Sequence, residues 1–499
     1  MIKDINTKKY SVLFMVLCLW LTSCRSTDDA VTDENNNSGT PFNVIVNLTG
    51  VEIEEGSLAK TAAIGGSKAA TAGVQQFVVP FDGLTNATVT LTPERSVFKT
   101  QASLNPVAGT PSITELGNNI MYKVAVYKTD GSFVDEKTFT YKTNNTNDQQ
   151  GFMLNGDQTY TFVAYSINST STVPAVTNTP RTLATDKLSG INGDLVYFRQ
   201  NMTVSGNGKN YISVVLKHKF TKITTVIDAT GVGNVSLVSN ARISPVGTSA
   251  DMKLSDGSLT YNGLGASAQV LNFKTIESQK VTSDTNLLIS NNEVGTNPAK
   301  LDIGTLIVGG TPQDNFNVPN INITPGNKYN LVVKLGPCRK ELYRTAFNTS
   351  NGNSQTLTLP ATDLGVVFDI YSLDDSFNLT INGTKIAQNE IFFAGSSGIY
   401  FADGSKYEDG TVPKVWFMSG TLTAPLVRVV VNRDGKVSMY GSKASGGRLY
   451  PLILAPGNSF NTVTWNTAGN NTIISQTAGF GATHISGAAI GIQSTPCTP

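Results

Sequence analysis

Apolar and polar residues alternate over many short stretches of the chain, and the first stretch begins shortly after residue 40. Every second residue from Phe42 to Leu48 is apolar, with Asn43 and Asn47 among the residues between them. A period of two residues is typical of a half-buried β-strand. The pattern therefore predicts a first strand at 42–54.

Two further alternating stretches flank an Asp130-Gly131 pair within residues 120–142. Asp-Gly between two such stretches is the strongest short-range signal for a β-hairpin. Another strand is predicted at 159–168, and no part of the chain has the pattern of a long, capped helix. We therefore expect an all-β protein.

Turn-rich breaks divide this all-β pattern into blocks. Residues 170–182 are rich in Thr and Pro and interrupt the alternation, which marks a first domain boundary. The sequence predicts one β-domain at 42–175, a second at 190–337 and a third at 339–499. A block of about 160 residues can bury a self-sufficient core, so we expect the third domain to fold by itself.

The first 23 residues have the features of a secretory leader. Three lysines precede the apolar run 12–21, which has about half of the roughly twenty residues that a membrane-spanning helix needs. Leu21-Thr22-Ser23-Cys24 then resembles a bacterial lipobox, in which the cysteine becomes the lipidated first residue. We expect 1–23 to be a lipoprotein signal peptide and Cys24 to carry lipid such as palmitate. The alternative is an ordinary signal peptide with an incidental cysteine.

Residues 24–41 are polar, acidic and without a regular period, which predicts a flexible tether. Acidic residues beginning four positions after Cys24 resemble the export signal that sends lipoproteins of the Bacteroidota to the outside of the outer membrane. The expected location is therefore the outer membrane, as a surface-exposed lipoprotein.

Charge and cysteine content limit the partners and the covalent links that the sequence predicts. The net charge is +1 and only 15% of residues are charged, so no electrostatic argument favours nucleic acid as a partner. Cys18 lies in the leader and Cys24 is assigned to lipid. Cys338 and Cys497 remain, in a compartment that permits disulfides, and they bracket the third block. We predict a disulfide between them; two free thiols are the alternative.

Signals for catalysis are few. Of the two histidines, His218 shares the parity of buried strand residues and is predicted to lie in a sheet interface, and His484 stands in a glycine-rich stretch. No nucleophile elbow and no zinc-ligand spacing is present, and "GVGNVS" (231–236) lacks the third glycine of a dinucleotide fingerprint. A glycosidase with two carboxylates stays open, because their spacing depends on the fold. We expect no enzymatic activity.

Several stretches, taken in order, resemble the fimbrillin-like (Mfa-like) family of Bacteroidota surface pilus proteins. The resemblance covers about residues 40–337 and rests, besides the lipobox, on "YKVAVYKTDGSF" (122–133), "YTFVAYS" (160–166), "DLVYFRQNMTV" (194–204), "VVLKHKFTKITTVID" (214–228) and "ITPGNKYNLVVKL" (323–335). It implies two tandem transthyretin-like β-sandwich domains, followed here by a third β-rich domain.

The same resemblance implies strand donation between pilus subunits. In that family a protease removes the first strand, and the terminal strand of a neighbour fills the groove by β-augmentation. The small-residue stretch 54–73 follows the first strand and offers Lys60 and Lys68 but no arginine, which departs from the family's arginine-specific trimming. Because Leu335 leads into a further block, the resemblance favours a pilus tip or accessory subunit, or a solitary adhesin.

The last block also resembles a C-terminal module of flavobacterial surface proteins. The resemblance rests on "FDIYSLDDSFNLTING" (368–383), "GIYFADGSKY" (398–407), "VWFMSG" (415–420), "RVVVNRDGKVSMYGSKASGGRLYPL" (428–452) and "FNTVTWN" (460–466). The resemblance implies no settled activity. Together with the strand pattern of this block, it leads us to expect that residues 339–499 carry recognition, as an adhesin domain.

One candidate binding site lies at an acidic turn. Asp374 and Asp375 follow an apolar strand, and carboxylates at such a strand end suit calcium, as in calcium-dependent sugar-binding sandwiches. Asp403, Glu408 and Asp409 form a second acidic turn. The alternative is structural, because Asp, Asn and Gly gather in turns for backbone reasons.

A second candidate is the glycine-rich loop 440–450. It carries Lys443 and Arg448 between Tyr440 and Tyr450, and sugars stack on aromatic rings and accept hydrogen bonds from such cations. An exposed hairpin loop is the alternative. Trp416 and Trp465 lie in strand patterns and are expected in the core.

The sequence thus favours a non-enzymatic outer-membrane surface lipoprotein, either a pilus tip or accessory subunit or an adhesin for attachment. Its expected partners are the membrane through the lipid, other pilus subunits by strand donation, and a host or environmental glycan. The alternative is a surface glycan-binding lipoprotein for nutrient uptake. No cofactor is expected except calcium at the acidic turn.

Overall fold

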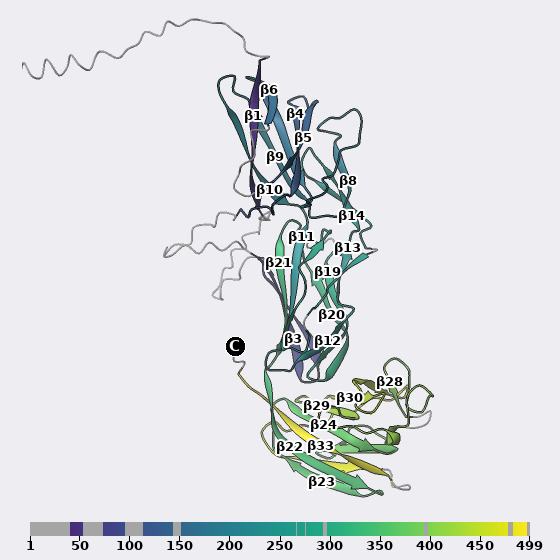
Figure 1. The fold of residues 1–499 in the computed structure, drawn as a ribbon. Coiled ribbons are helices and arrows are strands. Elements are labelled where there is room, and N and C mark those ends of the chain that lie inside the picture. Colours follow the sequence, from purple (N-terminus) through teal and green to yellow (C-terminus); the bar gives the residue numbers. More distant parts are fainter. Residues whose placement is uncertain are drawn as a thin grey trace, which may run out of the picture.

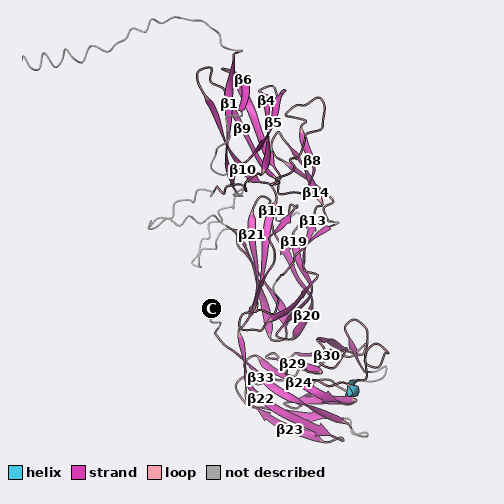
Figure 2. Ribbon diagram, viewed as in Figure 1, coloured by secondary structure: helices cyan, strands magenta, loops and turns pink. Residues whose placement is uncertain are grey.

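The computed structural model describes residues 40–52, 73–94, 113–142, 151–265, 267–274, 276–292, 297–393, 398–477 and 483–496. The predicted signal peptide (1–23), Cys24, nearly all of the predicted tether (24–41) and Cys497 lie outside these residues. The regular structure of the described residues consists of β-strands joined by turns and loops, with one short 3₁₀ helix, η1 (Val415–Phe417) (Figure 2). The all-β prediction is confirmed. No helix among the described residues has the length and hydropathy needed to span a membrane.

The first sandwich contains a seven-stranded sheet in the order β5-β4-β7-β9-β10-β1-β6. Its strands are β1 (Pro41–Glu52), β4 (Met121–Lys128), β5 (Phe133–Thr140), β6 (Gly151–Asn155), β7 (Thr159–Ser166), β9 (Val196–Thr203) and β10 (Asn210–His218). β9 and β10 pair at only two positions, so the sheet divides there into two layers. Both layers bury side chains in one core, to which β1 contributes Val44, Val46 and Leu48.

The hairpin predicted around residues 120–142 is present. β4 and β5 pair antiparallel, and Gly131 takes the positive φ of 83° that the turn requires. Asp130 Oδ1 accepts hydrogen bonds from the backbone N–H and hydroxyl of Ser132. The Asp-Gly pair therefore forms this turn through the hydrogen bonds of Asp130 and the backbone conformation of Gly131.

The second sandwich packs two sheets on one apolar core. One sheet runs β17-β11-β21-β3-β2, with β18 also on β11; these are β2 (Gln75–Asp82), β3 (Thr85–Pro93), β11 (Thr221–Asp228), β17 (Lys280–Thr282), β18 (Asn286–Leu288) and β21 (Lys328–Gly336). The other runs β12-β19-β13-β16, with β20 on β19; these are β12 (Val235–Ser239), β13 (Arg242–Val246), β16 (Ser267–Val270), β19 (Ala299–Val308) and β20 (Thr311–Ile321).

The predicted domain ranges 42–175 and 190–337 need correction, because the two sandwiches exchange strands. The β2–β3 hairpin from the first range lies in the second sandwich, where β3 pairs with β21. Conversely, β9 and β10 from the second range complete the first sandwich. Gln75 fastens the hairpin with hydrogen bonds of 2.6 Å and 2.9 Å to the backbone of Asn322. Alternation predicts strands but says nothing of their partners.

A three-stranded sheet joins the two sandwiches. It has the order β15-β14-β8 and comprises β8 (Lys187–Ile191), β14 (Ser249–Lys253) and β15 (Leu259–Asn262). The sheet covers the face of β4, β7 and β9 that carries Ala125, Tyr127 and Tyr165. Residues from both predicted ranges therefore close one interface.

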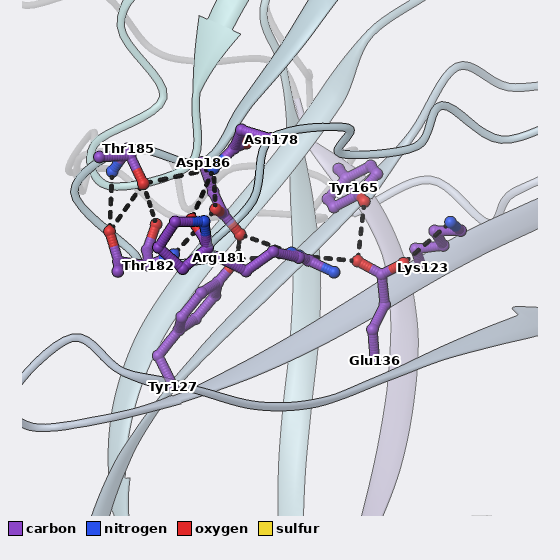
Figure 3. A network of polar contacts seen from close by, with 10 residues as sticks. Lys123, Tyr127, Glu136, Tyr165, Asn178, Arg181, Thr182, Thr185 and Asp186 are labelled. Carbon is purple, nitrogen blue, oxygen red and sulfur yellow. Dashed lines mark hydrogen bonds and ion pairs between the residues drawn. The ribbon is translucent and has the colours of Figure 1, made fainter.

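The Thr/Pro-rich stretch at 170–182, predicted as a domain boundary, is fastened to the first sandwich. Arg181 Nε donates to Asp186 Oδ2 at 2.8 Å and an Arg181 Nη2–Glu136 Oε2 ion pair measures 3.1 Å (Figure 3). The Tyr127 hydroxyl and the Asn178 amide also donate to the fully buried carboxylate of Asp186, at 2.7 Å and 2.9 Å. We call residues 170–182 the strap, because they lie across the first sandwich. They do not form a boundary between domains.

Residues from 339 onward build two sheets whose strands pair only with one another among the described strands. The larger runs β22-β33-β24-β29-β30-β31-β28, namely β22 (Arg339–Ser350), β24 (Gly365–Leu373), β28 (Ile399–Phe401), β29 (Val427–Asn432), β30 (Val437–Ser442), β31 (Leu449–Leu454) and β33 (His484–Ser494). The smaller contains β23 (Ser354–Leu359), β25 (Ser376–Ile381), β26 (Thr384–Lys385), β27 (Ile391–Phe392) and β32 (Asn471–Gln476). Trp465 lies in their shared core as predicted, and Trp416 packs partly buried against it.

The three β-units follow one another along an elongated molecule, with β1 and the C-terminal domain at opposite ends (Figure 1). The C-terminal domain lies against the β2–β3 and β19–β20 turns of the second sandwich. Leu84 inserts into an apolar cluster on the outer face of the larger sheet, formed by Leu364, Val367, Val430, Tyr440, Leu449 and Ile490.

Two arginines of the C-terminal domain fasten this contact. Arg428 forms two hydrogen bonds to Asp369, of 2.7 Å and 2.9 Å, and reaches Thr311 of the second sandwich at 3.2 Å. Arg339 donates to Thr85 at 3.0 Å and lies 3.4 Å from Asp82. The domain is therefore docked by polar and apolar contacts, besides the direct chain connection from β21 to β22.

Candidate functional site

The candidate loop at 440–450 joins β30 and β31 and lies beside the turn that follows β28. Lys443 Nζ donates to Asp403 Oδ2 at 2.6 Å. The same Nζ lies 4.8 Å from the ring centres of Phe401 and Tyr450, and the Arg448 guanidinium lies 4.2 Å from the ring of Tyr450. Lys443, Arg448 and Tyr450 are therefore brought together, and Asp403 joins them from the second acidic turn.

Tyr440 is not part of this group. In the register of β30 and β31, Tyr440 pairs with Pro451 while Tyr450 pairs with Gly441, so the two tyrosines point to opposite faces of the sheet. Tyr440 is 7% exposed and packs in the cluster around Leu84. Burial raises the pKa of its hydroxyl above the usual range. Its role is docking of the domain.

The electrostatics of the loop favour an anionic ligand over a neutral one. Hydrogen bonds from Lys443 and Ser405 lower the pKa of Asp403 to about 2, so Asp403 stays ionised and neutralises Lys443. No carboxylate among the described residues forms an ion pair with Arg448, which keeps its positive charge. Both cations lie against the Tyr450 ring, which limits the ring surface left for stacking a sugar.

The Asp374–Asp375 turn lies at the opposite end of β24 from Gly365. The Asp375 Oδ1 atom is buried and has no hydrogen-bond partner in the described part of the chain. Burial, Glu408 and Asp374 raise the pKa of Asp375. Among the described residues, no group of three or more His, Cys, Asp or Glu side chains is placed to hold a metal ion. A calcium ion at this turn stays a prediction.

The second acidic turn is explained in large part by backbone contacts. Asp409 Oδ1 accepts hydrogen bonds from the N–H groups of Thr411 and Val412, and these contacts, together with one from Lys406, lower its pKa. Asp403 accepts similar bonds from Ser405. Glu408 differs, because it forms an ion pair of 2.8 Å with Lys414.

An exposed aromatic residue next to these turns was not predicted. Phe417 is 75% exposed, and its ring centre lies 6.0 Å from that of Trp416. Lys414 Nζ lies 5.0 Å from the Trp416 ring. The 3₁₀ helix η1 places the two aromatic side chains differently from the strand assumed for "VWFMSG". No strand pattern in the sequence signals this 3₁₀ turn, so the exposure of Phe417 could not be predicted from alternation.

The two histidines lie apart from these loops. His218 is largely buried at the end of β10, with Nδ1 2.9 Å from Asp194 Oδ1, and Lys222 of β11 reaches the same carboxylate at 2.7 Å. His218 and Lys222 line a cavity of about 450 Å³ between the two sandwiches, with Phe220 among its apolar walls. His484 is the first residue of β33. The predicted position of His218 in a sheet interface therefore agrees with the structure.

Comparison with known proteins gives matches among solved structures only. No protein-family model matches the chain, and no curated protein matches it. Similar solved structures include a candidate cell adhesion protein from Bacteroides fragilis, at 13% identity and a TM-score of 0.34, over 59% of this chain and 92% of that one.

Two fimbrial proteins are also similar in structure. The fimbrial anchor protein Mfa2 from Porphyromonas gingivalis matches at 12% identity and a TM-score of 0.30, over 46% of this chain and 85% of its own. A fimbrial assembly protein from Parabacteroides distasonis matches at 14% identity and a TM-score of 0.28, over 42% of this chain and 82% of its own. The structural neighbours are thus fimbrial and adhesin proteins of Bacteroidota at low identity, the kind of protein that the sequence resembles.

Proposed function

We propose that this chain is a non-enzymatic surface adhesin, or a tip or accessory subunit of a fimbria, that binds its target through residues 339–499. The observation that carries the proposal is the docked C-terminal domain. It lies across the turns at one end of the second sandwich, held by Leu84, Arg428 and Arg339. An end closed in this way suits a terminal position, because each strand described there already pairs within this chain and is not free to be donated to a following subunit.

The edge of the C-terminal domain nearest this joint also suits a terminal position. β22 is an edge strand of twelve residues, and such edges invite pairing with other chains. A bulge between Glu341 and Tyr343 interrupts its register, and Arg344 pairs with Glu341 beside it. Bulges and charges are the usual protection against strand addition.

The opposite end of the molecule supports participation in strand exchange. β1 lies between β10 and β6 and fills a groove with Val44, Val46 and Leu48. A donor strand with the same alternation would fit that groove by β-augmentation if β1 were removed. Lys60 and Lys68, the basic residues proposed for cleavage, lie outside the described residues.

Attachment to the membrane is proposed through Cys24, which lies outside the described residues. The variant Cys24→Ser should release soluble protein from the membrane fraction and abolish labelling with palmitate. Unchanged membrane association of this variant would contradict the lipid anchor.

The bridge between Cys338 and Cys497 also remains a proposal. Arg339 pairs with Ser494, and the Thr495 N–H donates to the Cys338 carbonyl at 2.8 Å. Thr495, which precedes Cys497 by two residues, therefore lies next to Cys338. Mass spectrometry of a non-reduced digest should find the two cysteines in one linked peptide, and two free thiols would end the proposal.

A competition experiment tests the site of recognition. Soluble 339–499 should block attachment of cells that display the whole protein, whereas residues 25–338 should not. Arg448→Ala should weaken the block, and Arg433→Ala, an exposed arginine of the same domain, serves as the matched control. Blocking by 25–338 alone would move recognition into the sandwiches.

The alternative, a glycan receptor for nutrient uptake, is favoured by the Lys443–Arg448–Tyr450 group, which suits an acidic glycan. Electron microscopy of labelled cells separates the two. Label on fibres supports the fimbrial role, and label spread over the bare envelope with retention on acidic polysaccharide supports uptake. A calcium site at Asp374 and Asp375 should show as a higher melting temperature in calcium, because a ligand stabilises the state that it binds.

A further inference from the structure

We propose that this protein has a mechanical function: it resists tension along a line from β1 to β22, through two parallel strand pairs that are loaded in shear. We call this line the tension axis. The direction of the load rests on the proposed function, since an anchor before β1 and a target held by the C-terminal domain would pull the molecule lengthwise. The resistance itself follows from strand topology and can be measured without any target.

Parallel pairing is confined to this line in the described part of the chain. β1 pairs with β10 over eight positions, from Val44 with Asn210 to Glu52 with Lys217. β11 pairs with β21 over seven, from Lys222 with Lys328 to Asp228 with Lys334. All other ladders between described strands are antiparallel, including the one between β1 and β6. Strands joined by a hairpin pair antiparallel, whereas a parallel pair requires a long connection between its strands. The two parallel pairs are therefore a distinctive feature of the described strands.

The two pairs are joined end to end by short chain segments. β10 ends at His218 and β11 begins at Thr221, so a pull on one passes directly to the other. β21 ends at Gly336 and β22 begins at Arg339. The line therefore runs from β1 across hydrogen bonds to β10, along the chain to β11, across hydrogen bonds to β21, and along the chain into the C-terminal domain (Figure 1).

Each pair is pulled at opposite ends. Tension enters β1 at Pro41, its first residue, and leaves β10 at His218, its last. In a parallel pair this loads all the evenly spaced interstrand hydrogen bonds together, whereas a pull at one common end opens them one at a time. Side chains also resist sliding of β1 along β10, because a shift of one residue turns every side chain to the opposite face. Val44 and Val46 would be replaced in the core by Asn43 and Ile45, or by Ile45 and Asn47.

The chain offers no shorter covalent route past the first pair. The 22 residues from 53 to 74 connect β1 to β2, and fully extended they span up to about 75 Å. The gap that they bridge is smaller, because Glu52 and Glu94 line one cavity and Gln75 pairs with Leu91, three residues before Glu94. Because the length of this connection exceeds the gap, the hydrogen bonds of β1 to β10 and β6 take up the load before the connection does.

Side-chain contacts brace both joints along the tension axis. At the first joint, the Asp194 carboxylate forms an ion pair of 2.7 Å with Lys222 Nζ of β11. Its other oxygen lies 2.9 Å from His218 Nδ1 of β10. At the second, Arg339 and Arg428 hold the C-terminal domain to Thr85 and Thr311. These contacts keep the two pairs aligned with the pull.

Single-molecule force spectroscopy on residues 25–499 tests the proposal by changing only the direction of pulling. Handles on azide-bearing residues at Thr40 and Phe417 load the tension axis. Handles at Glu52 and Lys217, which are partners at one end of the β1–β10 pair, peel the same strands apart. The axial pull should need a rupture force higher by about a factor of two or more, because forced unfolding reports the barrier along the loaded direction. Equal forces in the two geometries would overturn the proposal.

The step length identifies which pair yields. Release of β1 transfers the load to β2 and frees the 34 residues from 41 to 74, a gain of up to about 120 Å. A longer first step at high force indicates that β11 and β21 separated first, which also supports the proposal. A first step at low force that frees the C-terminal domain would contradict it.

Two matched variants separate mechanical from thermodynamic effects. Val214 of β10 and Val124 of β4 are both fully buried in the same core, but only β10 lies on the tension axis. Val214→Ala and Val124→Ala should lower resistance to urea by similar amounts, and only Val214→Ala should lower the axial rupture force. An equal loss of force in Val124→Ala would show that the whole sandwich shares the load, against the proposal.

Discussion

Strands before residue 337 pair across large distances in the sequence, whereas strands from residue 339 onward pair within their own block. The second sandwich needs the β2–β3 hairpin at residues 75–93 to complete a sheet whose other members begin at residue 221. The C-terminal domain closes both of its sheets with strands between 339 and 494. The first arrangement makes two sandwiches interdependent, and the second makes a domain whose described strands need no partner from the rest of the chain.

The arrangement of strands also separates the part of the chain for which we propose a mechanical role from the part for which we propose recognition. Interleaving creates the long connections that parallel pairs need, and both parallel pairs lie in the first 336 residues. The C-terminal domain has antiparallel ladders and exposes the loops that carry Lys443, Arg448 and Phe417. Binding residues are commonly placed on loops of a rigid scaffold, and here the scaffold itself is docked on a second one.

The largest expected effect comes from cutting the chain between blocks. Residues 190–338 alone should remain unfolded, because β3, the strand between β21 and β2, is missing from the core. Residues 339–499 should melt cooperatively, since 160 residues with two complete sheets bury their own core. Circular dichroism and calorimetry of both fragments check this.

A rescue experiment serves as control for the first fragment. Fusing residues 73–94 to 190–338 should restore much of the second sandwich, because the hairpin regains its pairing with β21 and the clasp of Gln75 on Asn322. A cooperative melt of 190–338 without the hairpin would show that the interleaving is dispensable.

The second prediction concerns the ion pair that supports the joint between the halves. Arg428→Met should lower the free energy of unfolding of the C-terminal domain in the whole chain by about 3–5 kcal/mol, because the Asp369 carboxylate, 2% exposed, loses its partner. The double variant with Asp369→Leu should recover most of this loss, since an apolar pair of similar volume leaves no buried charge. Urea unfolding of both variants gives the comparison, and an equal loss in the double variant would mean that packing, not charge, is responsible.

Local patterns in the sequence predicted strands well and their partners poorly. The first strand, predicted at 42–54, extends over 41–52, and the Asp130-Gly131 hairpin is present. The β2–β3 hairpin could not be assigned to the second sandwich, because alternation fixes which side of a strand is buried and not which strand lies next to it.

The grouping of the candidate site residues was also predicted only in part, because alternation does not fix which strands lie next to each other. Lys443, Arg448 and Tyr450 share a surface, but the register of β30 and β31 turns Tyr440 to the other face. The exposure of Phe417 depends on a 3₁₀ turn that no strand pattern foretells. Loop contacts between Lys443 and Asp403, 40 residues apart, arise from tertiary packing of β28 beside β31.

The third prediction concerns acid stability at the joint between the two sandwiches. Burial alone would raise the pKa of Asp194, but the hydrogen bond and charge of His218 and of Lys222 outweigh it and lower the pKa to about 2. A carboxylate with a lowered pKa stabilises the folded state above its unfolded pKa of about 3.9, and this contribution disappears as the pH falls from about 4 to 2. The expected loss over that window is about 2 kcal/mol.

Asp194→Asn provides the control for this pH dependence. The variant should be less stable than the parent at pH 7, and the difference in unfolding free energy between them should shrink toward pH 2. Urea titrations at several pH values measure it. A difference that stays constant with pH would show that the charge of Asp194 is not what stabilises the joint.

The smallest expected effect compares two tyrosines on β4, which face opposite sides of the first sandwich. The Tyr127 hydroxyl donates to buried Asp186 at 2.7 Å, whereas the buried Tyr122 hydroxyl has no partner among the described residues. Tyr127→Phe should lower the free energy of unfolding by about 1.5 kcal/mol, the low end for a hydrogen bond to a charged group, because the Asp186 carboxylate still accepts hydrogen bonds from Arg181, Asn178 and Thr182. Tyr122→Phe should be neutral or slightly stabilising, because it removes an unsatisfied buried polar atom. Thermal and urea unfolding of the two variants should therefore differ in sign or size, and equal losses would mean that shape, not hydrogen bonding, fixes the strap to the sandwich.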